Sequence, residues 1–89
     1  MIRTFSEQEF NDKTKSDVWI CVILAISLGI SLGLDYVNPF EVECKEKTII
    51  FSIPREEWKG FLDNALNFFI SIEDYEICSD IKFIQNELL

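Results

Sequence analysis

The sequence predicts a small α+β domain: a short N-terminal helix, a central apolar helix, a β-hairpin and a C-terminal antiparallel helix pair. Three observations carry this prediction. Residues 18–34 contain no charge, strand-like segments follow Pro39, and apolar residues recur every three or four positions after Pro54. The length of 89 residues and the apolar content of 48% indicate one domain over 1–89.

The N-terminal helix is predicted from a capping-box pattern. Ser6 and Glu9 have the spacing at which the hydroxyl binds the third helical amide and the carboxylate binds the amide of the capping residue. We therefore expect a short helix from Ser6 to Asp12, with Phe5 and Phe10 as its apolar contacts.

The uncharged run 18–34 has two interpretations. Its length just reaches the lower limit of about 17 residues for a bilayer-spanning helix. Gly29 and Gly33 have the small-xxx-small spacing of paired membrane helices. Lysines precede the run and Asp35 follows it, which would place the N-terminus in the cytoplasm.

The alternative is that 18–34 forms the core of a soluble, cytoplasmic protein. The amphipathic second half of the chain needs an apolar partner, and a domain this small buries only about 60% of its unfolded surface. Serines and glycines also dilute the last half of the run. We favour the core helix and keep the single-pass span 18–34 as the alternative.

Within this run a helix is favoured over a strand. From Ile20 to Leu34 the even positions are aliphatic, which is a strand pattern. Ser16 is however a suitable N-cap, Asp17 suits a first helical turn, and Asn38-Pro39 supplies a stop. On a helix, the edge formed by alanine and the two glycines is where another element comes close.

The middle of the chain predicts a β-hairpin. The segments 40–44 and 48–53 are rich in β-branched and aromatic residues, and the charged residues 45–47 join them. Glu41 and Glu43 alternate with apolar residues, so one face of the first strand should be solvated.

Two amphipathic helices are predicted after the hairpin. Pro54 suits the first position of a helix, and Trp58 is expected to be buried against the central run. The second helix should begin within 71–74. The inward residues are Trp58, Phe61, Leu62, Ala65, Leu66, Phe69 and Ile72 on the first helix, and Ile77, Cys78, Ile81, Ile84 and Leu88 on the second.

The last helix carries a family resemblance. Its acidic-aromatic turn 73–76, the pair Cys78-Ser79, the pair Ile81-Lys82 and the later aliphatics Ile84 and Leu88 resemble the second half of a UVR-type helical hairpin. Phe83 stands where that family has an acidic residue. The resemblance covers at most 54–89. It implies antiparallel pairing of the last two helices and pairing with other proteins.

The charge pattern favours a protein partner with a basic surface. The net charge is −8, whereas nucleic-acid binders need clustered lysines and arginines. No basic residue lies between Gly60 and Ile81, and such a segment either steers a basic partner or only keeps the surface solvated. The candidate partner-binding residues are Asp63, Glu73, Asp74, Glu76 and Asp80, with Phe68 and Phe83 as aromatic contacts.

The sequence predicts no enzyme, cofactor or metal site. There is no histidine, so the three cysteines, Cys21, Cys44 and Cys78, have no histidine partner for a zinc site or a nucleophile pair. Their odd number and wide spacing indicate free thiols in a reducing compartment.

The resulting expectation is an acidic intracellular binding protein. It would act as an inhibitor, immunity protein, antitoxin or phage counter-defence protein by occluding a basic surface of its partner. Two alternatives remain open: a single-pass membrane protein with an acidic regulatory domain, and a self-associating structural subunit that forms a homodimer.

Overall fold

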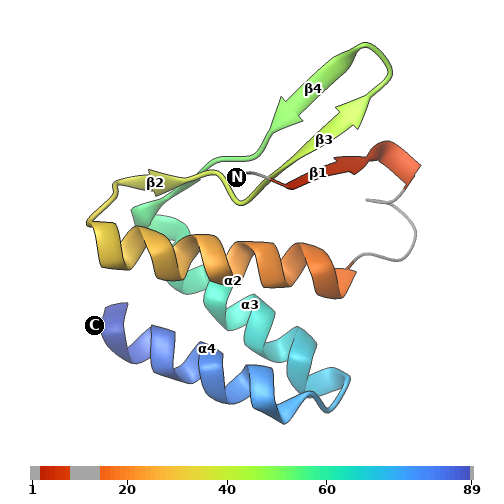
Figure 1. The fold of residues 1–89 in the computed structure, drawn as a ribbon. Coiled ribbons are helices and arrows are strands. Elements are labelled where there is room, and N and C mark those ends of the chain that lie inside the picture. The colour runs from red at the N-terminus through yellow and green to blue at the C-terminus, as the bar shows by residue number, and fades with distance from the viewer. Residues whose placement is uncertain (1–2, 9–14, 89) are drawn as a thin grey trace.

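The computed structural model describes residues 3–8 and 15–88 and has the predicted α+β fold with a C-terminal antiparallel helix pair (Figure 1). Its main helices are α2 (Lys15–Leu32), α3 (Trp58–Ser71) and α4 (Tyr75–Leu88), and a 3-10 turn, η1 (Arg55–Glu57), precedes α3. Its strands are β1 (Arg3–Ser6), β2 (Tyr36–Val37), β3 (Phe40–Cys44), β4 (Lys47–Ile50) and β5 (Ile53–Pro54).

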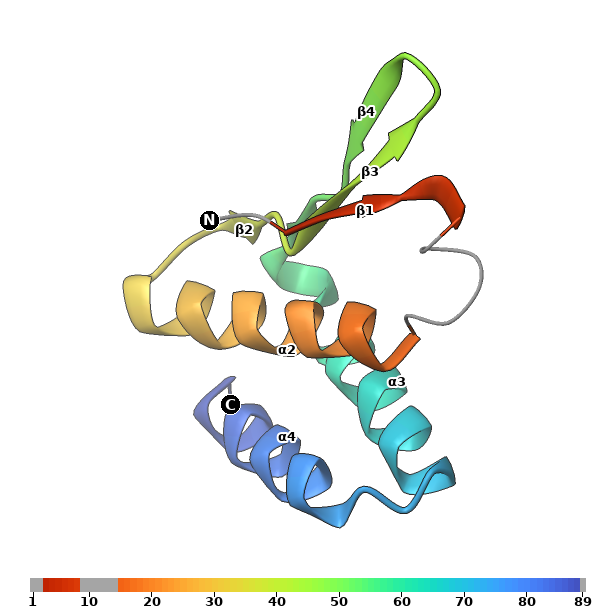
Figure 2. The ribbon, with the colours of Figure 1, turned by 45° about the vertical axis from the view of Figure 1, so that its right-hand side comes forward.

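The strands form two small sheets on one side of α2. The larger has the order β1-β3-β4, in which β1 is parallel and β4 antiparallel to β3. In the smaller, β2 and β5 are antiparallel, with Val37 opposite Ile53. Figures 1 and 2 show α3 crossing α2 from the side of the sheets, α4 on the other side of α2, and the tip of the β3–β4 hairpin projecting away from all three helices.

The N-terminal segment differs from the sequence prediction. Ser6 is the last residue of strand β1, and only Glu7 and Gln8 of the expected helix 6–12 are helical among the described residues. The rest of that helix, with Glu9 and Phe10, lies outside the described residues. Phe5 is fully buried, but from a strand: it pairs with Val42 and meets the Phe40 ring edge to face.

The central apolar run is a helix, α2, and not a strand. It begins at Lys15, so Ser16 is not the N-cap that the sequence suggested, because a capping residue lies outside the helical conformation. Lys15 is exposed, and lysine favours the helical conformation, so the helix already includes the residue before Ser16. Asp17 lies in the first turn, as expected.

The end of α2 is set by Gly33 and not by Asn38-Pro39. Gly33 has a φ of 66°, and the amides of Gly33 and Leu34 donate to the carbonyls of Ile30 (3.3 Å) and Gly29 (2.9 Å). This pair of bonds is a Schellman motif, in which the left-handed residue favours glycine. The helix therefore ends at Leu32, six residues before Asn38, and β2 follows.

The predicted hairpin is confirmed, but its second strand is shorter than expected. β4 ends at Ile50, and Ile53 instead joins β2 across the smaller sheet. Along β3 the side chains alternate: Phe40 and Val42 are buried, whereas Glu43 is exposed. The hairpin thus covers the core with one face of β3.

The predicted inward stripes of α3 and α4 meet α2 in a single core. Pro54 caps the 3-10 turn and is not the first helical residue. Ile72 is exposed because α3 ends at Ser71 and the chain then turns away. The buried residues of the two helices are Trp58, Leu62, Ala65, Phe69, Cys78, Ile81 and Ile84.

Trp58 lies at the centre of this core, as predicted. Its side chain is 0% exposed, and its indole N–H donates to the carbonyl of Ile53 at 2.9 Å. The ring also lies directly against Gly29 of α2. The close approach that the sequence predicted at the small-residue edge of the helix is therefore made inside the molecule, by Gly29.

Candidate protein-interaction surfaces

The outer face of α2 is apolar and uncovered. Leu24, Leu28 and Leu32 lie one helical turn apart and are 64%, 57% and 63% exposed. Val22, Ile23 and Ile26 point the other way, into the core. A helix that is apolar all round is normally buried all round, so this exposed face makes α2 a candidate interaction surface.

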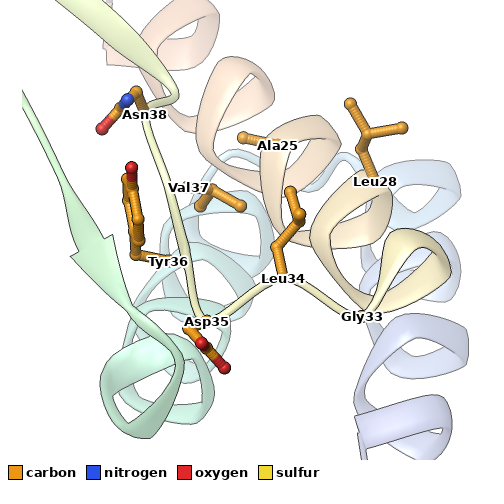
Figure 3. A pocket seen from close by; sticks show the side chains of 8 residues that line it. All are labelled: Ala25, Leu28, Gly33, Leu34, Asp35, Tyr36, Val37 and Asn38. Atoms are coloured by element: carbon orange, nitrogen blue, oxygen red, sulfur yellow. The ribbon is translucent and has the colours of Figure 1, made fainter.

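A groove runs along this face, between α2 and the chain that carries β1 and β2. Figure 3 shows its C-terminal part, where Leu34 and Val37 point toward Ala25 and the Asp35 carboxylate points away. The N-terminal part continues from Leu28 to Arg3 and Asp17. We call the whole the α2 groove; its lining residues include Arg3, Asp17, Ile20, Cys21, Leu24, Ala25, Leu28, Leu34, Asp35 and Tyr36.

Charged groups flank this groove at both ends. At the N-terminal end, Arg3 forms an ion pair with Asp17 at 3.5 Å, and both side chains are about half exposed (51% and 49%). The Arg3 guanidinium also lies over the Phe5 ring, 4.6 Å from its centroid. At the other end, Asp35 follows directly after Leu34. The Arg55 side chain donates to the Leu34 carbonyl at 3.0 Å, so an arginine and a carboxylate lie at each end of the apolar surface.

Cys21 lies in the wall of the α2 groove. Burial raises the pKa of its thiol; nearby Arg3 acts in the opposite direction, and Asp17 raises it further. A raised pKa keeps the thiol protonated near neutral pH, and a thiol is a weaker nucleophile than a thiolate. Cys21, Cys44 and Cys78 are free thiols in the described part of the chain.

The predicted acidic residues do not form one patch. Asp63, on α3, accepts a hydrogen bond from the Gln85 amide of α4 at 2.8 Å. It lines a cleft together with Arg55 and Lys59. Glu73 is exposed in the turn between α3 and α4, where it has a φ of 60°. These two carboxylates therefore come from α3 and from the turn, and not from the helix that carries Glu76 and Asp80.

Asp74 has a structural role, because it caps α4. Its side chain accepts from the Ile77 amide at 3.4 Å, and its own amide donates to the Phe69 carbonyl at 2.9 Å. The sequence suggested Ser71 as the cap and Asp74 as its acidic third residue, but the helix begins later and Asp74 is the residue that caps it. Ser71 instead ends α3, where its hydroxyl donates to the Phe68 carbonyl at 2.6 Å.

We expect Asp74→Ala to lower the free energy of unfolding by about 1 kcal/mol, because the substitution removes the side-chain cap. Asp74→Asn keeps an acceptor and should leave stability nearly unchanged. Urea denaturation of both variants measures the difference, with Asp80→Ala, on the exposed side of α4, as the control. Equal stability of Asp74→Ala and the wild type would contradict a capping role.

Glu76, Asp80 and Phe83 do share one face, the outer side of α4. They lie three or four residues apart, as does Glu87, so the four side chains form a stripe that we call the α4 stripe. Phe83 is 65% exposed, as the sequence predicted, and it has a carboxylate one turn away on each side. Glu87 was not among the residues predicted from the sequence, although its four-residue spacing from Phe83 could have indicated it.

Phe68 is part of the packing between α2 and α3. It is half buried, with its ring 6.5 Å from that of Trp19 and 5.1 Å from that of Phe69. Trp19 also lines an apolar cavity of about 240 Å³ with residues of α3 and of the chain after β4. Phe68 is therefore less available to a partner than Phe83.

Residues 3–8 and 15–88 contain no group of three or more histidine, cysteine, aspartate or glutamate side chains placed to hold a metal ion. By length and composition, α2 could cross a bilayer, and 22% of its residues are buried within the fold. Comparisons with protein-family models, curated proteins and solved structures find no match.

Proposed function

We propose that this chain is a small, acidic, non-enzymatic module that binds a basic surface of another protein through the α4 stripe. The observation that carries the proposal is Phe83, a large aromatic side chain that is 65% exposed between carboxylates. Aromatic anchors supply much of the affinity in protein interfaces, and surrounding charges mainly accelerate association. Binding there would occlude the basic surface of the partner. Inhibitors, immunity proteins, antitoxins and phage counter-defence proteins would act in this way.

The rest of the molecule supports this proposal. α4 is held on the fold by its buried side chains and by the Asp74 cap, so the stripe is presented on a rigid element. The net charge of −8 attracts basic partners over long distances. The proposed location is cytoplasmic, which suits free thiols, and no cofactor takes part.

The proposal is tested with a displayed library of random peptides selected on the immobilised protein. We expect the selected peptides to be enriched in lysine, arginine and apolar residues. Phe83→Ser should weaken binding of the best synthetic peptide by at least about tenfold, as for an interface anchor. Ile49→Ser is the control, because Ile49 is similarly exposed on the distant strand β4. Peptides without a basic bias, or equal binding by Phe83→Ser, would reject the α4 stripe.

Charge is tested separately by converting the predicted acidic set, Asp63, Glu73, Asp74, Glu76 and Asp80, to the corresponding amides. The fold should persist, because asparagine keeps an acceptor at positions 63 and 74. The wild type should bind the peptide more slowly as salt rises, and the neutralised protein should begin slower and respond less. Stopped-flow or surface association rates measure this. Identical rates and salt dependence would assign the carboxylates to solubility alone.

A further inference from the structure

An apolar cavity of about 240 Å³ opens between α2, α3 and the chain that follows β4, and we call it the α2–α3 cavity. Four of its lining residues are buried in the core, whereas Trp19 and Phe51 are partly exposed. The cavity therefore reaches from the surface of the molecule into its core. The four buried residues are Val22, Pro39, Phe40 and Ile53.

The polar groups beside the α2–α3 cavity are largely bonded to other parts of the protein. Ser52 carries the only hydroxyl among the lining residues, and this hydroxyl donates to the Asn38 side chain at 2.6 Å. The Ile53 carbonyl accepts from the Trp58 indole at 2.9 Å. The only other polar group on a lining side chain is the indole N–H of Trp19. A water molecule in a cavity needs about two to four polar partners, so this wall binds water poorly.

The size and the composition of the wall indicate what fits the α2–α3 cavity. The Phe40 and Phe51 rings lie 4.6 Å apart with their planes at 34°, and Trp19 and Phe61 bring the number of aromatic rings to four. Aromatic rings pack well against the faces and edges of other rings. An apolar cavity of about 150 Å³ already holds benzene.

From these observations we infer that the α2–α3 cavity is a binding site for a small, uncharged, apolar molecule built on one or two rings. Such a molecule gains the dispersion contacts that the wall lacks while the cavity is empty. It also gives up no hydrogen bond to water on entry, because it makes none. The site lies apart from the α4 stripe and does not depend on the function proposed for it.

A side chain of a protein partner fits the α2–α3 cavity less well. Its insertion would bring the partner's main chain to the mouth, where N–H and C=O groups need hydrogen bonds. The side chains of Trp19, Phe51 and Phe61 offer one N–H donor and no oxygen acceptor there. The lining also contains no charged residue, so it does not attract the basic partner proposed for the α4 stripe.

The first test is a titration with toluene, followed in two-dimensional ¹H–¹⁵N spectra. We expect saturable shifts of the Trp19 indole signal and of the amides of 51–53, while the amides of Phe83 and Glu87 stay unchanged. Phenol has nearly the same shape as toluene but carries a hydroxyl that loses its water on entry. It should therefore bind at least about tenfold more weakly.

Substitutions at position 18 test the location, because Val18 lines the α2–α3 cavity and is half-buried. Val18→Phe places a ring in the cavity and should weaken toluene binding by at least about tenfold, with far-UV circular dichroism unchanged. Val18→Ala enlarges the cavity, so it should favour naphthalene over toluene more than the wild type does. Leu24→Ala is the matched control on the exposed face of the same helix and should leave binding of both molecules unchanged.

Several results would overturn the inference. They are the absence of saturable binding up to the solubility of toluene, equally tight binding of phenol, unchanged toluene binding by Val18→Phe, or an unchanged preference in Val18→Ala. Loss of the selected peptide in Val18→Phe would also overturn it and assign the cavity to a side chain of a protein partner. Phe83→Ser should still bind toluene, so failure of this site and failure of the α4 stripe are distinguishable.

Discussion

Trp58→Ala is expected to lower the free energy of unfolding by about 3–5 kcal/mol, as other aromatic-to-alanine changes in cores do. The indole is fully buried, lies against Gly29, and donates a hydrogen bond to the carbonyl of Ile53. The Arg55 guanidinium also lies 4.7 Å from the ring centroid. Small domains are stable by only about 5–15 kcal/mol, so this variant should be close to unfolding at room temperature.

Urea denaturation followed by circular dichroism measures this loss of stability. Trp58→Phe separates the contribution of apolar packing from that of the hydrogen bond to Ile53. Phenylalanine keeps most of the apolar volume but leaves the Ile53 carbonyl without its donor, which costs about 1–3 kcal/mol. We therefore expect Trp58→Phe to lie between the wild type and Trp58→Ala. Unchanged stability of Trp58→Ala would mean that α3 does not pack on α2 as described.

Gly29→Ala should destabilise the protein by about 1–3 kcal/mol, although alanine favours helices. A Cβ atom at position 29 would lie 2.6 Å from the Val37 Cγ1 atom and 2.7 Å from the Trp58 ring. The overpacking outweighs the helix preference of about 1 kcal/mol. Thermal and urea denaturation both measure the change in stability. Adding Val37→Ala to Gly29→Ala should remove the contact with the Val37 Cγ1 atom and so reduce the overpacking.

Gly60→Ala is the matched control within the same protein. Gly60 is also helical, but a Cβ atom there would have no neighbour within 4 Å. This substitution should raise stability by up to about 1 kcal/mol, through helix propensity alone. If Gly29→Ala and Gly60→Ala were equally stabilising, the close approach of Trp58 to α2 would be refuted.

The sequence was sufficient where a local pattern determines the structure. The three- and four-residue spacing after Pro54 predicted both final helices and the burial of Trp58. Charge alternation predicted the two faces of β3. Strand β1 was not predictable in the same way, because four residues carry little periodicity and their partner is β3, far along the chain.

The candidate surfaces were less predictable than the fold. A stretch without basic residues appears as one acidic block in sequence, but the turn after α3 separates Asp63 from the carboxylates of α4 and uses Asp74 as a cap. The uncovered face of α2 could not be read from the sequence either. Its apolar residues surround the helix, so only the packing of α3 and the strands shows which side remains exposed.

The parallel pairing of β1 with β3 has a consequence for the order of folding. Thr4 of β1 lies beside Glu41 of β3, 37 positions away, whereas the β3–β4 hairpin and the α3–α4 pair each close within a short turn. Distant contacts form later, since closing a longer loop costs more chain entropy. Until β1 docks, the edge of β3 is open and Phe5 is in water. Hydrogen exchange in pulse-labelled refolding should therefore protect β1 last, and strand exchange between chains is most accessible in that interval.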